Sequence, residues 1–143
     1  MKLPVTYALI LFLISFKSSA QKPCDFLGPL HFKNGKATAI VKATYLGFTE
    51  TNNPQIIEQL HKKKIIDGKK YANIDFKGEG GIGGTDIDFS IANCPTPFYY
   101  GTVQQGLNLN KLKSRKIIKM KCTVYQGVKN DKGLPFFTVE EIN

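Results

Sequence analysis

The segment Lys36–Phe48 most constrains the fold, because its side chains alternate between apolar and polar along its length. A two-residue period places successive side chains on opposite faces of an extended strand, so one face is buried and the other meets solvent. Ile40 is the exception on the polar side. The predicted buried side consists of Ala37, Ala39, Val41, Ala43 and Tyr45.

Further strands are predicted after this one, each from the same alternation or from a run of aromatic residues. The turn Lys129–Gly133 separates the last two of them. Within Ile117–Tyr125 the expected inward residues are Ile118, Met120, Cys122 and Val124. The predicted strands are Tyr71–Phe76, Asp86–Ile91, Phe98–Val103, Ile117–Tyr125 and Leu134–Ile142.

One short helix is predicted in the stretch NNPQIIEQLHKKKIIDG. Asn53 can cap its start, Pro54 suits its first turn, and Gly68 ends the segment. Glu58 lies four residues before Lys62, which is a favourable ion-pair spacing on a helix. Its apolar stripe consists of Ile56, Ile57 and Leu60.

A glycine-rich run follows, and it contains the letters G-x-G-x-x-G at Gly78, Gly80 and Gly83. A dinucleotide loop needs a helix directly after the glycines, whereas Thr85–Ile91 alternates like a strand. Ile74-Asp75-Phe76 and Ile87-Asp88-Phe89 repeat one pattern on both sides of the run. We therefore predict a hairpin tip and no nucleotide site.

The first twenty residues are typical of a secretory signal peptide, with Lys2, an apolar run from Tyr7 to Phe16, and small residues before a cleavage point after Ala20. The apolar run is shorter than the roughly 20 residues that span a bilayer. The expected mature chain, residues 21–143, is long enough for one domain. The predicted location is secreted or periplasmic.

The mature chain would be basic, because removing Lys2 and Lys17 from the 20 basic residues leaves 18 against 11 acidic ones, a net charge of about +7. Such a charge favours anionic partners, although it equally serves solubility. Tyr125 shares the outward face of Lys119 and Lys121 and could stack on a base or sugar ring. The candidate binding residues are Lys62, Lys63, Lys64, Lys69, Lys70, Tyr71, Lys77, Lys119, Lys121, Tyr125, Lys129 and Lys132.

No catalytic constellation is visible, and no enzyme activity or cofactor is expected. His31 and His61 have no Cys, Asp or Glu at metal-ligand spacing, so both are interpreted as ordinary surface histidines. Neither Ser90 nor Ser114 lies in a nucleophile elbow. Three outward aspartates, at positions 75, 86 and 88, could bind a hard cation, but a solvated sheet face is the favoured interpretation.

The C-terminal third, SRKIIKMKCTVYQGVKNDKGLPFFTVEEIN, resembles the last hairpin of an OB-fold barrel. The long first strand and the glycine-tipped hairpin are similar to the first three strands of that fold. The expected fold is therefore mainly β, a five- to six-stranded OB-like barrel with one short helix. The usual helix lies between the third and fourth strands, where Leu107–Lys113 could supply a helical turn; otherwise an α+β roll is the alternative.

The resemblance also implies a binding face, since OB-folds bind oligonucleotides or oligosaccharides across strands two and three and the flanking loops. The loops here would be Thr49–Lys70 and Gln126–Leu134. Outward aspartates and export both make nucleic acid a weaker candidate than an anionic polysaccharide or a protein partner. The face would include Tyr71, Asn73, Asp75, Lys77, Asp86, Asp88 and Ser90.

The three cysteines of an exported chain permit one disulfide and one free thiol. Cys122 is in step with the apolar residues of its strand, so it is predicted to be a buried free thiol. Cys24 and Cys94 lie where the backbone is free to meet disulfide geometry, and they are the predicted bridge. A Cys94–Cys122 bridge is the alternative.

Together these features predict an exported, non-enzymatic binding module for an extended anionic ligand or a protein partner. The alternative is a structural or accessory secreted domain with no small ligand.

Overall fold

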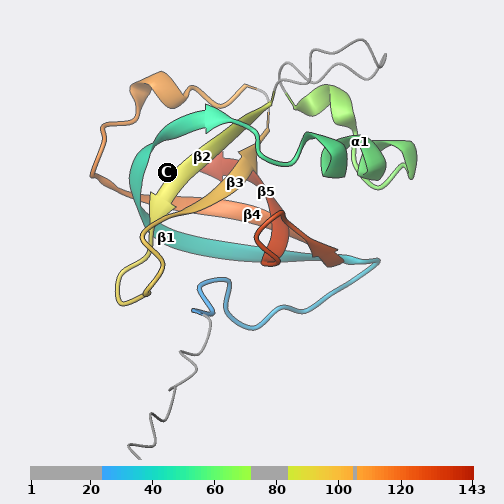
Figure 1. Ribbon diagram of the computed structural model, residues 1–143, viewed down its shortest axis with the longest axis horizontal. Coiled ribbons are helices and arrows are strands. Elements are labelled where there is room, and N and C mark those ends of the chain that lie inside the picture. Colours follow the sequence, from blue (N-terminus) through green and yellow to red (C-terminus); the bar gives the residue numbers. More distant parts are fainter. Residues whose placement is uncertain (1–23, 72–83, 105) are drawn as a thin grey trace, which may run out of the picture.

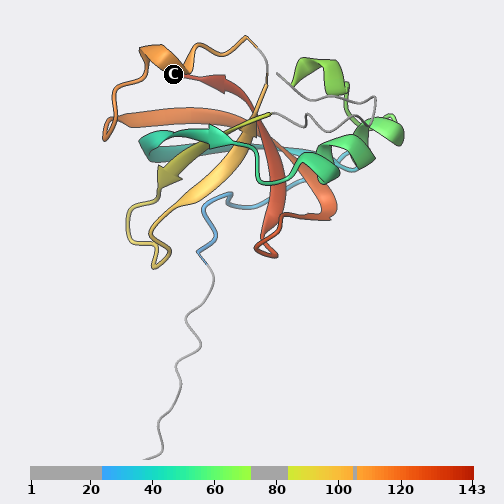
Figure 2. The ribbon, with the colours of Figure 1, turned by 45° about the horizontal axis from the view of Figure 1, so that its top comes forward.

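A computed structural model describes residues 24–71, 84–104 and 106–143 (Figures 1 and 2). The predicted signal peptide, the glycine run up to Gly83 and most of the predicted strand Tyr71–Phe76 lie outside the described residues. Among the described residues, no helix is long and apolar enough to cross a membrane. The strands are β1 (Lys36–Glu50), β2 (Thr85–Ser90), β3 (Tyr99–Val103), β4 (Ile117–Lys129) and β5 (Pro135–Ile142).

The five strands form a closed barrel in the order β1-β2-β3-β5-β4. The first part of β1 pairs with β4, from Lys36 to Thr44, and the second part pairs with β2, from Thr44 to Glu50. β3 and β5 run parallel, with Thr102 opposite Thr138, and this contact closes the barrel. The mainly β, OB-like barrel predicted from the sequence is therefore confirmed.

The predicted hairpin between Tyr71–Phe76 and Asp86–Ile91 has its first arm and its tip largely outside the described residues. β2 hydrogen-bonds to β1 along one edge and to β3 along the other.

The barrel core is filled by the residues that the alternation placed inward. On β1 the small alanines alternate with Val41 and Tyr45, while larger side chains such as Phe89, Met120 and Phe137 come from the facing strands. The polar side of β1 is exposed, including Ile40, as predicted. Side chains from two connecting segments complete the core: Leu27 and Phe26 from the N-terminal segment, and Leu107, Leu109 and Leu112 from the β3–β4 connection.

The connection between β3 and β4 contains the 3-10 turn η2 (Leu109–Lys111), at the position predicted for a helical turn. Leu109 is buried in the barrel core. Figures 1 and 2 show this connection and the N-terminal segment on different sides of the barrel.

Helix α1 (Pro54–Lys62) follows β1 and precedes β2 along the chain, where the sequence predicted it. The 3-10 turn η1 (Gly68–Lys70) comes after it. The helix packs outside the barrel, at the right of Figure 1, and forms a second apolar cluster. Glu58 and Lys62 form the expected ion pair, with 2.6 Å between the carboxylate oxygen and Nζ. The buried members of the second cluster are Ile57, Leu60, Ile66, Tyr71, Tyr125 and Phe136.

Two predictions about individual side chains around α1 are corrected. Asn53 stands at the start of the helix, but its side chain makes no capping hydrogen bond. The residue is buried, at 3% exposure. His61 is half-buried, and its Nδ1 accepts a hydrogen bond of 2.9 Å from the backbone N–H of Gly68. It therefore helps to hold η1 against the helix, whereas His31 is exposed as predicted.

Candidate functional site

A pocket of about 410 Å³ lies over β2 and β3, between the β1–α1 connection and the β4–β5 turn. We call it the β2–β3 pocket. Asp88 is the residue of the face implied by the OB-fold resemblance that lines it, and both implied loops contribute to it. It is lined by Thr49, Glu50, Asn52, Asp88, Phe98, Tyr100, Asp131 and Lys132.

Buried Asp86 fixes one side of this pocket. One carboxylate oxygen accepts hydrogen bonds from the hydroxyls of Thr51 and Thr102, both at 2.8 Å. The other accepts bonds from the backbone N–H of Asn52 at 2.8 Å and from its Nδ2 at 3.2 Å. Asp86 therefore holds the β1–α1 connection against β2 and β3. The prediction of a solvated Asp86 is wrong, because that connection covers the outward face of β2.

Asn53 fixes the other side by joining the two loops. Its Oδ1 accepts a hydrogen bond of 3.1 Å from the backbone N–H of Asp131, at the β4–β5 turn. Asn130 orders the turn itself, because its Oδ1 accepts bonds from the backbone N–H groups of Lys132 and Leu134 at 3.0 and 2.9 Å. Both loops that border the pocket are thus fixed by hydrogen bonds before any ligand arrives.

Two aromatic rings form the apolar part of the pocket. Phe98 is 41% exposed, whereas Tyr100 is only 5% exposed. The Tyr100 hydroxyl is buried and has no hydrogen-bond partner among the residues that the structure describes. The ammonium of Lys132 lies over both rings, with Nζ 4.1 Å from the centroid of Phe98 and 4.9 Å from that of Tyr100.

The charge of the β2–β3 pocket is opposite to that of the whole chain. Three carboxylates, from Glu50, Asp88 and Asp131, line it together with the single ammonium of Lys132. Burial raises the pKa of Asp88, as does the nearby charge of Asp86, while a hydrogen bond from Thr49 and the charge of Lys132 lower it. The pocket therefore suits a positive or hydrogen-bond-donating group better than a phosphate.

The predicted basic residues at the end of α1 do not reach this pocket. Lys62, Lys63 and Lys64 are exposed in the last turn of the helix and just beyond it. Lys62 is already paired with Glu58. Lys132 is the predicted binding lysine that lines the β2–β3 pocket, and Lys129 is exposed at the end of β4.

Four other predicted residues meet in a second cavity of about 560 Å³ beside η1: Lys70, Tyr71, Lys121 and Tyr125. The two tyrosines are poorly placed to stack on a ligand ring. Tyr71 and Tyr125 are buried at 5% and 4% exposure, and burial raises the pKa of both. Tyr125 is therefore not the exposed ring that the sequence suggested, because it packs with Ile57 and Leu60 of α1 in the second apolar cluster.

The Tyr125 hydroxyl makes a buried polar contact, and Lys121 is paired. The Tyr125 hydroxyl lies 3.0 Å from Oγ1 of Thr138. Lys121 donates to Glu141 at 2.7 Å, and this hydrogen bond raises its pKa. Lys121 is thus less available to an anionic ligand than the sequence suggested.

Lys119 stands in a different setting, on the outer face shared by β1 and β4. It lies directly opposite Lys42 in the strand register. Ile40 and Ile117, at 53% and 67% exposure, flank this pair of lysines. We call Ile40, Lys42, Ile117 and Lys119 the β1–β4 basic patch.

Most of the remaining predicted binding residues lie outside the described residues or have no described side chain. Asn73, Asp75 and Lys77 fall within residues 72–83, and Lys69 belongs to η1 without a described side chain. Ser90 is half-buried at the end of β2. The described members of the predicted set therefore lie at several separate places and do not form one basic surface.

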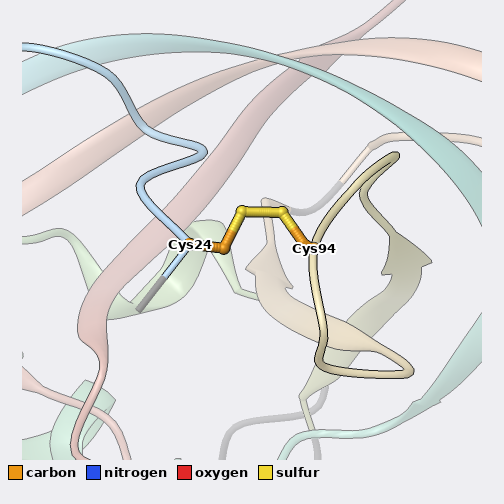
Figure 3. The surroundings of a disulfide bond; sticks show 2 residues. All are labelled: Cys24 and Cys94. Carbon is orange, nitrogen blue, oxygen red and sulfur yellow. A yellow bond between two sulfur atoms is a disulfide. The ribbon is translucent and has the colours of Figure 1, made fainter. Parts of the chain in front are cut away.

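The cysteine predictions are confirmed. Cys24 and Cys94 form a disulfide between the N-terminal segment and the loop after β2, with a Cα–Cα distance of 5.5 Å (Figure 3). Cys122 is a free thiol that is completely buried, and burial raises its pKa to about 12. The alternative bridge between Cys94 and Cys122 does not form.

Sequence reasoning missed Phe98 and Tyr100 as site residues. Both were counted only as strand-forming aromatics. The available signal was Pro97 immediately before Phe98, because proline cannot donate to a sheet ladder and so marks the start of the strand. A large aromatic residue at that start is only partly covered by neighbouring strands.

A cation site at the aspartates receives no support from the described part of the chain. There, no group of three His, Cys, Asp or Glu residues is placed to hold a metal ion. Asp86 instead uses its oxygens for protein hydrogen bonds.

Comparison with known proteins gives no relative from which a function could be transferred. No protein-family model, curated protein or solved structure matches this chain.

Proposed function

We propose that this chain is an exported, non-enzymatic binding module, and that its ligand or protein partner lies across the β2–β3 pocket. The strand order and the parallel β3–β5 contact support an OB-fold, whose members bind extended ligands over the same two strands. Export is inferred from the N-terminal sequence. The absence of a catalytic constellation in the sequence supports a binding role.

The observation that carries this proposal is the fixed position of both loops around the pocket. Asp86 holds the β1–α1 connection, and Asn53 joins it to the β4–β5 turn. Loops that are ordered in advance lose less conformational entropy when a ligand binds. The partly exposed ring of Phe98 then supplies apolar contact area in the pocket.

The test is a two-dimensional NMR titration of the mature chain with anionic polysaccharides, oligonucleotides and basic peptides, each at low and moderate salt. We expect the amide shifts of the bound state to cluster around the β2–β3 pocket. Phe98→Ala should weaken binding by about tenfold, as expected for an aromatic hot spot. Phe32→Ala is the matched control, since it removes another exposed ring, which lines neither the β2–β3 pocket nor the β1–β4 basic patch.

Two results would contradict the proposal. One is a ligand whose shifts lie away from the pocket and whose affinity is unchanged by Phe98→Ala. The other is no binding by any member of the panel at low salt, which would favour the accessory-domain alternative.

A second candidate function is binding of an anionic ligand at the β1–β4 basic patch. Lys42 and Lys119 are directly opposite, and like charges in that position destabilise a sheet. An anionic ligand would relieve this repulsion. Binding there should weaken as salt rises and should be reduced by Lys42→Gln and Lys119→Gln. Lys62→Gln, which removes a lysine already paired with Glu58, is the control.

A further inference from the structure

The β2–β3 pocket already contains an ammonium group that belongs to the protein. Nζ of Lys132 lies within 5 Å of two ring centroids, at 4.1 Å from Phe98 and 4.9 Å from Tyr100. A cation within about 6 Å of an aromatic centroid is attracted by the negative face of the ring. The pocket is therefore chemically suited to an alkylammonium group.

The carboxylates of the pocket are not neutralised by this lysine at close range. Among the described residues, the ion pairs are those of Lys62 with Glu58 and of Lys121 with Glu141, so none involves Lys132. Glu50, Asp88 and Asp131 nevertheless line the same space as its ammonium. Without Lys132 the pocket would hold two rings and three carboxylates, and no cation.

The side chain of Lys132 can move out of the pocket without breaking the hydrogen bonds of the β4–β5 turn that carries it. The turn is held by backbone N–H groups that donate to Asn130, including the N–H of Lys132 itself. It is also held by the backbone pair of Asn130 and Leu134, and Gly133 adopts the required positive φ of 75°. None of these contacts uses the Lys132 ammonium.

We propose that the β2–β3 pocket recognises an alkylammonium group carried by a lysine side chain of a protein partner, and that Lys132 occupies the place of this group until it is displaced. This inference rests on the proposed function, because it names the chemical class bound at the same site. It also explains why a basic protein keeps three carboxylates around one exposed aromatic ring.

The proposal makes Lys132 an intramolecular competitor of the ligand. If its ammonium fills the pocket nine-tenths of the time, only about a tenth of the molecules are ready to bind, and the apparent affinity is about tenfold weaker than that of the open pocket. Removal of this ammonium should therefore strengthen binding. A lysine that served the ligand directly would show the opposite effect.

The experiment measures binding of a tetra-lysine peptide to the mature chain by NMR titration at low salt. Lys132→Gln should raise the affinity by about tenfold. Lys129→Gln is the matched control, since it removes one positive charge from the same hairpin at an exposed residue that does not line the pocket. Asp88→Asn, added to Lys132→Gln, should lower the affinity again by about tenfold.

Three probes test whether the pocket recognises an ammonium group and whether that group belongs to a protein or to a free polyamine. Nε-acetylation of the tetra-lysine peptide should abolish binding to the Lys132→Gln variant. Nα-acetyl-lysine methylamide should shift amides around the pocket and compete with the peptide. Spermidine tests a free polyamine as the source, and it should bind more weakly than the peptide.

An affinity that is unchanged or reduced in Lys132→Gln would overturn the proposal, as would equal binding of the acetylated peptide. Tighter binding of spermidine than of the peptide would overturn the assignment to a protein partner. If instead a neutral or anionic ligand binds the pocket and is weakened by Phe98→Ala, the ammonium inference fails while the proposed function stands.

Discussion

Asp86 shows how a charged residue on the outward side of a strand can become fully buried. Its side chain points away from the barrel core, since Ile87 next to it points inward, yet it has no exposed surface. The cause is the β1–α1 connection, which supplies donors from Thr51 and Asn52 to the carboxylate. A buried carboxylate is retained only where such donors satisfy it.

Replacement of Asp86 should separate the effect of the hydrogen bonds from that of the charge. Asp86→Ala leaves the Asn52 N–H without its partner and should lower the free energy of unfolding by about 2–4 kcal/mol. Asp86→Asn should cost much less, because its oxygen can accept from Asn52 while its NH₂ donates to the hydroxyls of Thr51 and Thr102. Urea unfolding measures both. Equal losses in the two variants would contradict this explanation.

The titration of Asp86 should give stability a pH dependence of defined sign. Burial raises the pKa of Asp86 above its ordinary value of 3.8, despite hydrogen bonds that lower it. The folded state therefore binds this proton more tightly than the unfolded state does. The resulting stabilisation is fully present below pH 3.8 and is lost as the pH rises through the raised pKa.

The measurement compares urea unfolding of the wild type and Asp86→Asn across a series of pH values. The stability of the wild type relative to the variant should fall as the pH rises through this window and should then level off. Asp88→Asn is a useful control, because the charge of Asp86 also raises the pKa of Asp88. A relative stability that increases with pH would show that the hydrogen bonds outweigh burial.

Among the elements, the parallel contact of β3 with β5 depends on a glycine. A Cβ added to Gly101 would lie 2.8 Å from Cζ of Phe137 and closer still to its Cε2. The Phe137 ring is buried in the barrel core and contacts the rings of Phe26 and Phe89, so it cannot move freely. The lack of a side chain at Gly101 thus lets a large ring fill the centre of the barrel.

Gly101→Ala should therefore lower the free energy of unfolding by about 1–3 kcal/mol through overpacking. Addition of Phe137→Leu should recover part of this loss, since the smaller side chain makes room for the new methyl group. A double-mutant cycle by urea unfolding gives the coupling between the two positions. Additive losses would show that the two residues do not compete for space.

At the level of the elements, the alternation predicted which side of a strand faces the core. It did not predict which segments pack over the outward side. The inward residues of β1 and β4 were all identified, because a two-residue period directly reports which side of a strand is apolar. Tyr125 and Asp86 were misjudged, because the period does not report what packs over the outward side. The docking of α1 on β4 and β5 and the hydrogen bonds of Asp86 both join residues far apart in sequence. The β2–β3 pocket was expected only in outline, through the OB-fold resemblance.

For the molecule as a whole, the N-terminal segment acts as part of the barrel. Phe26 lies against three core rings, with centroid distances of 4.6 Å to Tyr99, 5.8 Å to Phe89 and 6.1 Å to Phe137. The disulfide from Cys24 to Cys94 holds this segment in place (Figure 3). Its two cysteines are 70 residues apart in the sequence.

Loss of this disulfide should destabilise the whole domain. A closed loop of 70 residues restricts the unfolded chain, and its removal should cost about 4 kcal/mol. The test compares urea unfolding of the oxidised wild type with that of Cys24→Ala/Cys94→Ala. Reduction of the wild type should reproduce the stability of the double variant, because Cys122 takes no part in the bridge. Equal stability of the oxidised and double-variant proteins would contradict the prediction.

The pairing of β1 with β4 also governs when this chain can fold during its synthesis. The partners of Lys36–Thr44 are residues 117–125, so β1 is made long before β4 exists. An unpaired strand with one apolar face is a template for aggregation. Lys36 and Lys42 lie on the polar face of that strand. Charged residues at such positions oppose self-association. The lysines of β1 are therefore expected to oppose self-association of the chain before the barrel closes.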